Sequence, residues 1–394
     1  MTVLTPGAAE PGTRTLRPAL TELRLTACAS HIGVTLPVEP LTILTGRSGS
    51  GRSSALRAYR ALARLAGGAS LARAFPDPAG WVPEHLGPDV SGRRGFRVGC
   101  TVDGPAGPVR LDLAVQVEPE LRVAGERLTG ADGTELFVTA LRDPTRSTVQ
   151  AAWYTAGAAV VTRAPFPDDR LGTAVVPLRV AGRTPGQRRV LAAAEQVVVA
   201  LRSVFVCDPD PERMRATGPP PAGTERDTGR LLPDCGNLAA VLRRTRTECA
   251  QRHARLVAAV RAGCPGPVVD LRTEGPPDGT QRAVLDRGDG RLTPVQRLGD
   301  GELRYLALAL VLLTGSGVLD VDPATEIPSA YQCLTVLADD LDRSLDDRQV
   351  RELAALAAAM CERGHVRLVG SARGAAQLRA GVPGDPLTVV DLDR

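Results

Sequence analysis

The sequence LTILTGRSGSGRSS, residues Leu41 to Ser54, has the pattern of a strand, a glycine-rich loop and a helix. Strand-forming residues lead into a glycine-rich segment, and residues with helical periodicity follow it. The spacing G-x-x-x-x-G-K-[ST] of a phosphate-binding loop is matched by Gly46, Gly51, Arg52 and Ser53, with arginine at the lysine position. In such a loop the glycines let successive N–H groups face phosphate oxygens, and the next helix directs its positive dipole end to the same anion. The stretch predicts a phosphate site, and an ordinary Gly/Ser turn is the alternative.

A second segment, near the C-terminus, places acidic residues at the end of a predicted strand. In CLTVLADDLDRSLDD, residues 333–347, an apolar run ends at Asp339 and Asp340. Ligands of parallel α/β sheets bind at the carboxyl ends of the strands, where these side chains would lie. With a phosphate loop upstream, this is the Walker B arrangement: the first acid holds Mg²⁺ and the second positions or deprotonates water. The alternative is a group of helix-capping aspartates.

A third segment, VQRLGDGELRYLALALVLL at residues 295–313, lies between the other two. Its glycine-rich turn, Leu298 to Glu302, opens a helix that is almost entirely apolar. A helix N-terminus of this kind can bind an anion. A capped core helix without a ligand explains the segment better when it is considered alone.

Composition limits the class of protein without naming it. The 394 residues suffice for one large α/β domain or two ordinary ones, and 43% hydrophobic residues support a sizeable core. The formal charge is 48 − 44 = +4 with no basic block, so charge neither demands nor excludes nucleic-acid binding. All 48 basic residues are arginine. Because the chain uses arginine in place of lysine throughout, arginine at the lysine position of the loop is weak evidence that catalytic function has been lost there by selection.

Cysteine and histidine usage predicts no dedicated metal site. The eight cysteines form no C-x-x-C pair, and the four histidines form no ligand pattern, so reduced thiols in a cytoplasmic protein are expected. The N-terminal residues lack the basic and apolar regions of a signal peptide. The longest apolar run, Tyr305 to Leu313, is too short to span a bilayer, so no membrane partner is expected.

Periodicity predicts an alternating α/β chain with an antiparallel region. Alternation across residues 96–138, broken by glycine-rich turns, favours an antiparallel sheet. Residues 190–206 favour a helix followed by a strand. Further helices are expected at 53–65, 147–159, 238–262, 302–314 and 347–363, and further strands at 22–28, 33–38, 41–45, 268–272, 283–286, 333–338 and 366–370.

The order of these motifs resembles a known family. Together with DCGNLAAVLRRTR at residues 234–246, it is similar to predicted ATPases of the AAA class that share the ABC/SMC-like head fold, the RecF- and OLD-related group. That family's runs G-x-N-G-x-G-K-S, G-S-N-L-A, L-S-D-G-x and D-E-P followed by T-H-S match residues 46–53, 236–239, 298–302, 339–341 and 370–373. The resemblance implies an α/β P-loop NTPase head with a mixed central sheet, an antiparallel β subdomain and an inserted helical region.

The resemblance also implies a domain layout. Residues 1–18 would be a flexible tail, and residues 19–394 a single head. Within the head, residues 19–75 would form the Walker A lobe, residues 76–264 the antiparallel sheet, connector and helical insertion, and residues 265–394 the signature and Walker B lobe.

The resemblance assigns roles to residues around ATP and Mg²⁺. Ser53 and Asp339 would hold the metal, and Asp340 would stand where the catalytic glutamate sits. The implied nucleotide-binding residues are Gly46, Gly49, Ser50, Gly51, Arg52, Ser53 and Ser54 in the loop, and Gly299, Asp300, Gly301 and Glu302 in the signature. The signature would contact ATP held by a second copy, and residues 341–346 would cross the dimer. For the glutamine of the Q-loop, Gln116 and Gln150 are candidates only.

Four departures from the family pattern concern groups that sense or activate the γ-phosphate. Arginine replaces lysine at residue 52, glycine replaces the signature serine at 299, aspartate replaces glutamate at 340, and alanine stands at 372 where a switch histidine is expected. Losing one transition-state donor costs about 10²–10³ in rate, and several such losses need not add. We therefore expect Mg-ATP binding with slow or lost hydrolysis. Whether the chain is an active ATPase, an enzyme that hydrolyses the acid anhydride of ATP, stays open. The alternatives are a non-catalytic, nucleotide-gated scaffold or partner subunit and, with less support, a DNA-repair or defence-type ATPase.

Overall fold

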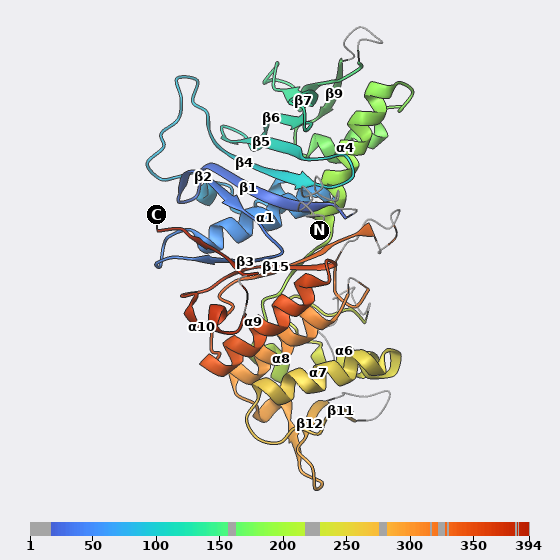
Figure 1. The fold of residues 1–394 in the computed structure, drawn as a ribbon. Helices are drawn as coiled ribbons and strands as arrows, with labels where there is room; N and C mark the ends of the chain where they lie inside the picture. Colours follow the sequence, from blue (N-terminus) through green and yellow to red (C-terminus); the bar gives the residue numbers. More distant parts are fainter. Residues whose placement is uncertain are drawn as a thin grey trace, which may run out of the picture.

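A five-stranded parallel sheet forms the centre of the molecule (Figure 1). The computed structural model describes residues 17–156, 163–216, 229–275, 282–315, 317–321, 328, 331–382, 384 and 386–393. In spatial order the strands are β10 (Val204–Val206), β14 (Leu334–Ala338), β15 (Val366–Ser371), β3 (Leu41–Thr45) and β16 (Thr388–Asp391). Every neighbouring pair is parallel, so the carboxyl ends of all five strands lie at one edge.

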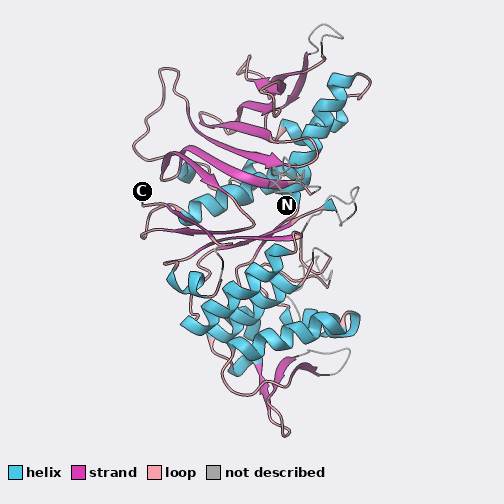
Figure 2. Ribbon diagram, viewed as in Figure 1, coloured by secondary structure: helices cyan, strands magenta, loops and turns pink. Residues whose placement is uncertain are grey.

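The two faces of this sheet are covered by different layers, as Figure 2 shows. Side chains alternate between the faces of a strand, so Ile43 packs with helices α8 (Asp300–Leu313) and α9 (Asp347–Glu362), while Leu44 packs with α1 (Arg52–Ala66). All five residues of β3 are buried in consequence. This is the reason that the strand reads as a continuous apolar run rather than an alternating one.

An eight-stranded antiparallel sheet forms the second large layer. Its order is β2 (His31–Pro37), β1 (Ala19–Cys28), β4 (Arg94–Asp103), β5 (Val109–Glu118), β6 (Arg122–Thr129), β7 (Glu135–Ala140), β8 (Thr148–Trp153) and β9 (Arg163–Pro167). Helix α1 lies between this sheet and the parallel one, and α4 (Pro185–Arg202) packs along the antiparallel sheet and against α1. The antiparallel sheet predicted for residues 96–138 is confirmed and is longer than predicted.

Helices on the other side of the parallel sheet form the helical region. Helix α6 (Leu238–Glu248) and α7 (Ala250–Gly263) pack with α8 and α9, next to a three-stranded sheet of β11 (Asp270–Glu274), β12 (Arg282–Asp286) and β13 (Leu292–Pro294). Shorter helices are α2 (Leu71–Ala74), α3 (Gly172–Val175), α5 (Pro211–Arg215) and α10 (Ala376–Ala380), with 3₁₀ turns at Ala79–Trp81, Val176–Leu178 and Val295–Arg297. No helix among the described residues combines the length and apolarity needed to cross a membrane.

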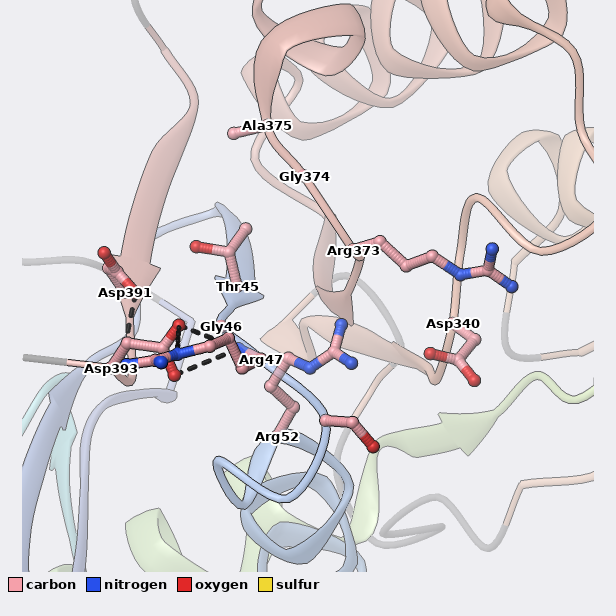
Figure 3. A pocket seen from close by; sticks show the side chains of 11 residues that line it. Thr45, Gly46, Arg47, Arg52, Asp340, Arg373, Gly374, Ala375, Asp391 and Asp393 are labelled. Atoms are coloured by element: carbon pink, nitrogen blue, oxygen red, sulfur yellow. Dashed lines mark hydrogen bonds and ion pairs between the residues drawn. The ribbon is translucent and has the colours of Figure 1, made fainter.

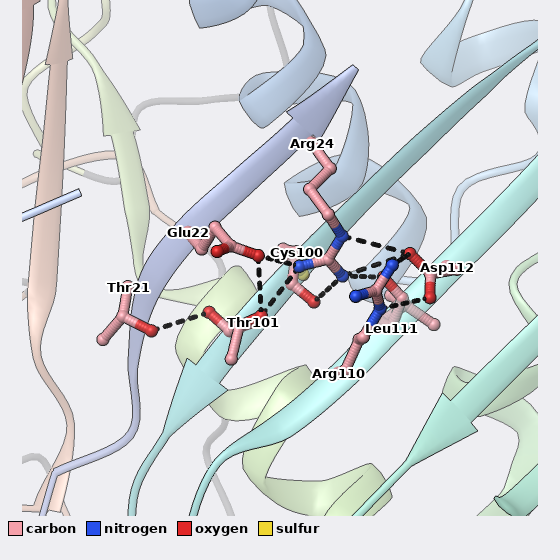
Figure 4. Close-up of polar contacts among 8 residues, drawn as sticks. All are labelled: Thr21, Glu22, Arg24, Cys100, Thr101, Arg110, Leu111 and Asp112. Atoms are coloured by element: carbon pink, nitrogen blue, oxygen red, sulfur yellow. Dashed lines mark hydrogen bonds and ion pairs between the residues drawn. The ribbon is translucent and has the colours of Figure 1, made fainter. Parts of the chain in front are cut away.

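Arg24 joins three strands of the antiparallel sheet through one guanidinium group (Figure 4). From β1 it donates to the carbonyl of Cys100 on β4 at 2.9 Å and to the carbonyl of Leu111 on β5 at 3.1 Å. It also pairs with the carboxylates of Glu22 and Asp112. Because its side chain is only 11% exposed, Arg24 is a buried donor that links these polar groups of three strands.

Three expectations are corrected by the fold. The helix expected at residues 147–159 is wrong, because Val149, Ala151 and Trp153 alternate inward as strand β8 and pair with β7 and β9; residues 157–162 lie outside the described residues. The helix expected at 238–262 is divided at Cys249 into α6 and α7. The molecule does mix parallel and antiparallel strands, but in separate sheets rather than in one central sheet. Residues 1–16 of the expected tail also lie outside the described residues.

Candidate functional site

The register of the parallel sheet brings the predicted loop and the predicted acidic residues to one edge. Ala338 on β14 is level with Gly370 on β15, and Gly370 is level with Ile43 on β3. Asp339 and Gly46 therefore leave the sheet in the same direction. Only β15 separates their strands, which corresponds to about 10 Å at the usual strand spacing.

Positive backbone φ angles shape the loop between β3 and α1. Gly46, Gly49 and Gly51 have φ values of 144°, 86° and 94°. A Cβ on Gly51 would lie 2.5 Å from atoms of the His31 ring, which also forms a 3.1 Å hydrogen bond to the Gly51 carbonyl. Glycine at this position is therefore required both by conformation and by the close approach of β2. Burial lowers the pKa of His31, so the ring is neutral at pH 7.

The start of α1 offers N–H groups that the protein itself leaves without acceptors. Within the loop, Ser50 N–H donates to the Arg47 carbonyl at 3.1 Å, and Ala55 N–H donates to Gly51 at 2.9 Å. In the described part of the chain, no acceptor is found for the N–H groups of Arg52 to Ser54. No acidic residue lies in the first turn of this helix. Its N-terminus is therefore suited to an anion.

A pocket of about 600 Å³ opens beside the loop at this edge (Figure 3). Three arginines face it: Arg47 and Arg52 from the loop and helix, and Arg373 from the end of β15. Arg52 donates to the Ala372 carbonyl at 2.5 Å, whereas the guanidinium of Arg373 has no partner among the described residues. The remaining lining residues are Thr45, Gly46, Ser48, Asp340, Gly374, Ala375, Asp391 and Asp393.

The acidic pair after β14 is held by the end of β15. The hydroxyl of Ser371 donates to the Asp339 carboxylate and accepts from Asp340 N–H at 2.9 Å. Asp340 has a φ of 44°, an uncommon conformation for a non-glycine residue, and its side chain faces the pocket. The Asp340 carbonyl accepts from buried Arg304 of α8 at 3.2 Å. The strand end is thus fixed from both sides.

The residues at this edge fit a magnesium ion that accompanies a phosphate ligand. One Asp339 oxygen receives the hydrogen bonds from Ser371 and Asp340, which leaves the other oxygen without a partner in the described part of the chain. The Ser53 hydroxyl is exposed at the first turn of α1. Carboxylate, hydroxyl and phosphate oxygens form the donor set that Mg²⁺ prefers.

Only part of the predicted nucleotide-binding set lines the pocket. Gly46 and Arg52 do so, as does Asp340, the predicted catalytic residue. The other loop residues, Gly49, Ser50, Gly51, Ser53 and Ser54, belong to the same loop and first helical turn without lining the pocket. The glutamines do not approach it: Gln116 lies on β5 and Gln150 on β8, in the antiparallel sheet.

The predicted signature turn lies at the start of α8 and does not line this pocket. Its own acidic side chains cover it, since Glu302 accepts from Gly299 N–H at 3.1 Å. Asp300 pairs with Arg215 at 2.5 Å. Gly301 packs so closely on the loop after β14 that a Cβ would lie 2.2 Å from the Ser344 carbonyl oxygen. The helix end is thus partly neutralised within this chain.

The sequence interpretation did not identify four charged residues of the pocket: Arg47, Arg373, Asp391 and Asp393. A usable signal existed for Arg373, because it lies two residues after β15, a correctly predicted strand of the same sheet. A weaker one existed for the aspartates, because TVVDLD repeats the pattern of an apolar strand followed by acids.

Sequence comparison finds no matching family model and no matching curated protein. Structural comparison finds SMC head domains. An Smc head bound to the C-terminal winged-helix domain of ScpA aligns with a TM-score of 0.45 at 12% identity, over 92% of each chain. An Smc head with an extended coiled coil, bound to the C-terminal domain of ScpA from Pyrococcus furiosus, gives 0.42 at 12%, over 93% of this chain and 92% of the other. The SMC head domain from Thermotoga maritima gives 0.41 at 11%, with the same coverage.

Proposed function

We propose, from the geometry of the loop and the sheet edge, that this chain binds Mg-ATP as an ABC/SMC-like P-loop ATPase head and hydrolyses it slowly or not at all. The observation that carries the proposal is the convergence at one sheet edge of a glycine-shaped loop, the open N-terminus of α1 and three arginines. The guanidinium groups that line this pocket can donate charge-assisted hydrogen bonds to the oxygens of a bound phosphate.

The triphosphate would lie along the loop, with its oxygens on the N–H groups that begin α1. Arg52 and Arg373 would neutralise its charge from two sides of the pocket. Ser53 and Asp339 would hold the magnesium ion, which neutralises the β- and γ-phosphate oxygens when bound. The hydrogen bond from Ser371 would keep the Asp339 carboxylate oriented toward the metal.

Weak hydrolysis is supported by the way the reacting end is arranged. Arg52 is directed to the Ala372 carbonyl and is a planar fork rather than a compact ammonium. Ala372 itself is fully buried and offers no side-chain donor. Asp340 is the only carboxylate at the end of β14 that faces the pocket, and it is one methylene shorter than glutamate. A water could be positioned there, but with few groups to stabilise the transition state.

Binding and turnover measured on the same preparation test the proposal. We expect Mg-ATP to bind with a Kd in the micromolar range, and EDTA to weaken binding because the metal links the phosphates to Asp339. Asp339→Asn should weaken Mg-ATP binding at least tenfold, whereas Asp289→Asn, a matched charge change on a side chain that is 92% exposed, should not. Absence of binding at millimolar Mg-ATP would refute the proposal.

A second candidate, a nucleotide-gated scaffold that never forms a composite dimer site, is favoured by the signature turn. Asp300 and Glu302 already place two carboxylates at the start of α8, where a second copy would need to present its γ-phosphate. Light scattering with and without Mg-ATP separates the candidates. A nucleotide-dependent dimer supports the ATPase head, and a monomer that binds ATP without turnover supports the scaffold.

A further inference from the structure

The C-terminal strand extends into the pocket beside the loop. Strand β16 pairs in parallel with β3, so that Asp391 is level with Thr45. The pairing continues one step further, because Leu392 N–H donates to the Thr45 carbonyl at 2.9 Å. The next residue, Asp393, therefore lies against Gly46, the first glycine of the loop.

The carboxylate of Asp393 binds the loop in the way that a phosphate would. Its two oxygens lie 2.8 and 3.0 Å from the backbone nitrogen of Arg47, and one lies 3.5 Å from Nε of the Arg47 guanidinium (Figure 3). A turn supports this position, since Asp393 N–H donates to the Asp391 carboxylate at 3.1 Å. Both aspartates line the pocket.

We propose that Asp393 is an internal anion that competes with the phosphates of the nucleotide, so that nucleotide binding requires the C-terminal residues to leave the loop. This inference rests on the proposed function. While Asp393 is in place, one loop N–H and one guanidinium already have a negative partner. Three aspartates balance the three arginines of the pocket, which would otherwise carry an excess of positive charge. A second anion entering the same pocket is repelled.

The contact has the properties of a displaceable one. The Asp393 side chain is 27% exposed and that of Arg47 is 87% exposed, so their ion pair is accessible to water and contributes little to stability. Beyond β16, the segment is held by the hydrogen bonds of Leu392 and Asp393 described above and by the Leu392 side chain, which packs against the hydrophobic core, so the contact that gives way is the exposed one of Asp393.

Removing the charge of Asp393 tests the inference. We expect Asp393→Asn to bind Mg-ATP at least fivefold more tightly than the unchanged chain, with the difference decreasing at high salt. Asp289→Asn, which removes one negative charge from an exposed turn outside the pocket, should bind within twofold of the unchanged chain. In the unchanged chain, saturating Mg-ATP should accelerate hydrogen exchange at the Leu392 amide at least threefold.

The outcomes separate this inference from the proposed function. If the unchanged chain binds Mg-ATP and Asp393→Asn binds it equally or more weakly, the carboxylate supports the loop and the competing-anion inference is wrong. If neither protein binds Mg-ATP, both proposals are wrong. Asp393→Ser provides a second neutral variant, and an unchanged melting temperature for either one ensures that the comparison is made on folded protein.

Discussion

At the scale of single residues, the arginines around the pocket differ in how firmly they are held. Arg52 is bound to a backbone carbonyl and Arg47 to Asp393, whereas within the described residues Arg373 is fixed only at its backbone, where its N–H donates to Asp342 at 3.0 Å. Arg373 is therefore the cation with the most freedom to meet an incoming ligand. Its position at the end of β15 places it opposite the loop.

Arg373→Ala should weaken Mg-ATP binding about tenfold or more, because a charge-assisted hydrogen bond to phosphate contributes about 1.5–3 kcal/mol. ADP, which has one phosphate fewer to contact, should be affected less. Arg379→Ala is the control, since Arg379 is exposed on α10 and does not line the pocket. Equal losses for ATP and ADP would contradict a role at the terminal phosphate.

His31 makes the stability of the loop dependent on pH. Burial lowers the pKa of the folded-state ring, so below about pH 6.5 the unfolded chain binds a proton that the folded chain does not. Its contribution to the unfolding free energy should fall as pH drops below 6.5, by at most about 1.4 kcal/mol per pH unit. Urea unfolding of the unchanged chain and of His31→Gln between pH 5 and 7.5 measures this. Parallel pH curves for the two proteins would contradict the assignment.

At the scale of elements, the start of α8 is joined to the loop after β14 by a glycine contact. Gly301→Ala should lower the unfolding free energy by about 2 kcal/mol, because its Cβ would lie 2.2 Å from the Ser344 carbonyl oxygen. Alanine is otherwise favoured over glycine inside a helix. Gly299→Ala is the matched control, since its Cβ would have no neighbour nearer than 3.8 Å. If Gly301→Ala is as stable as the unchanged chain in chemical denaturation, this contact does not constrain α8.

The antiparallel sheet depends on Arg24 in a way that its exposed neighbour Arg110 does not share. Arg24→Ala should cost about 2–4 kcal/mol of unfolding free energy, because it removes a buried donor shared by carbonyls and carboxylates of three strands. Arg110 also pairs with Asp112, but its side chain is 53% exposed, so Arg110→Ala should cost less than about 1 kcal/mol. Comparable losses for the two variants in urea denaturation would show that the network is not organised around Arg24.

At the scale of the whole molecule, the sequence predicted the elements whose signal is local. The apolar runs that became β3, β14 and β15 are buried on both faces, and the glycine spacing of the loop is a local requirement of its φ angles. These elements alone predicted that the loop and the acidic pair share one sheet edge. Strand β8 was wrongly predicted as a helix because its alanines favour a helix. Its pairing with β7 and β9 makes the segment a strand instead.

The parts that could not be predicted depend on contacts between residues far apart in the chain. The hydrogen bond between Arg47 and Asp393 joins residues 346 positions apart, and the bonds from Arg24 to β4 and β5 span 76 to 88 positions. No periodicity or spacing encodes such pairs. The charge balance of the pocket therefore depends on the pairing of β16 with β3, which the sequence does not predict.

A crystal structure with a non-hydrolysable Mg-ATP analogue tests the central claim most directly. We expect phosphate density on the N–H groups that begin α1, magnesium between Ser53 and Asp339, and Asp393 displaced from Arg47. A saturating analogue bound away from this edge, or no analogue bound at all, would contradict it.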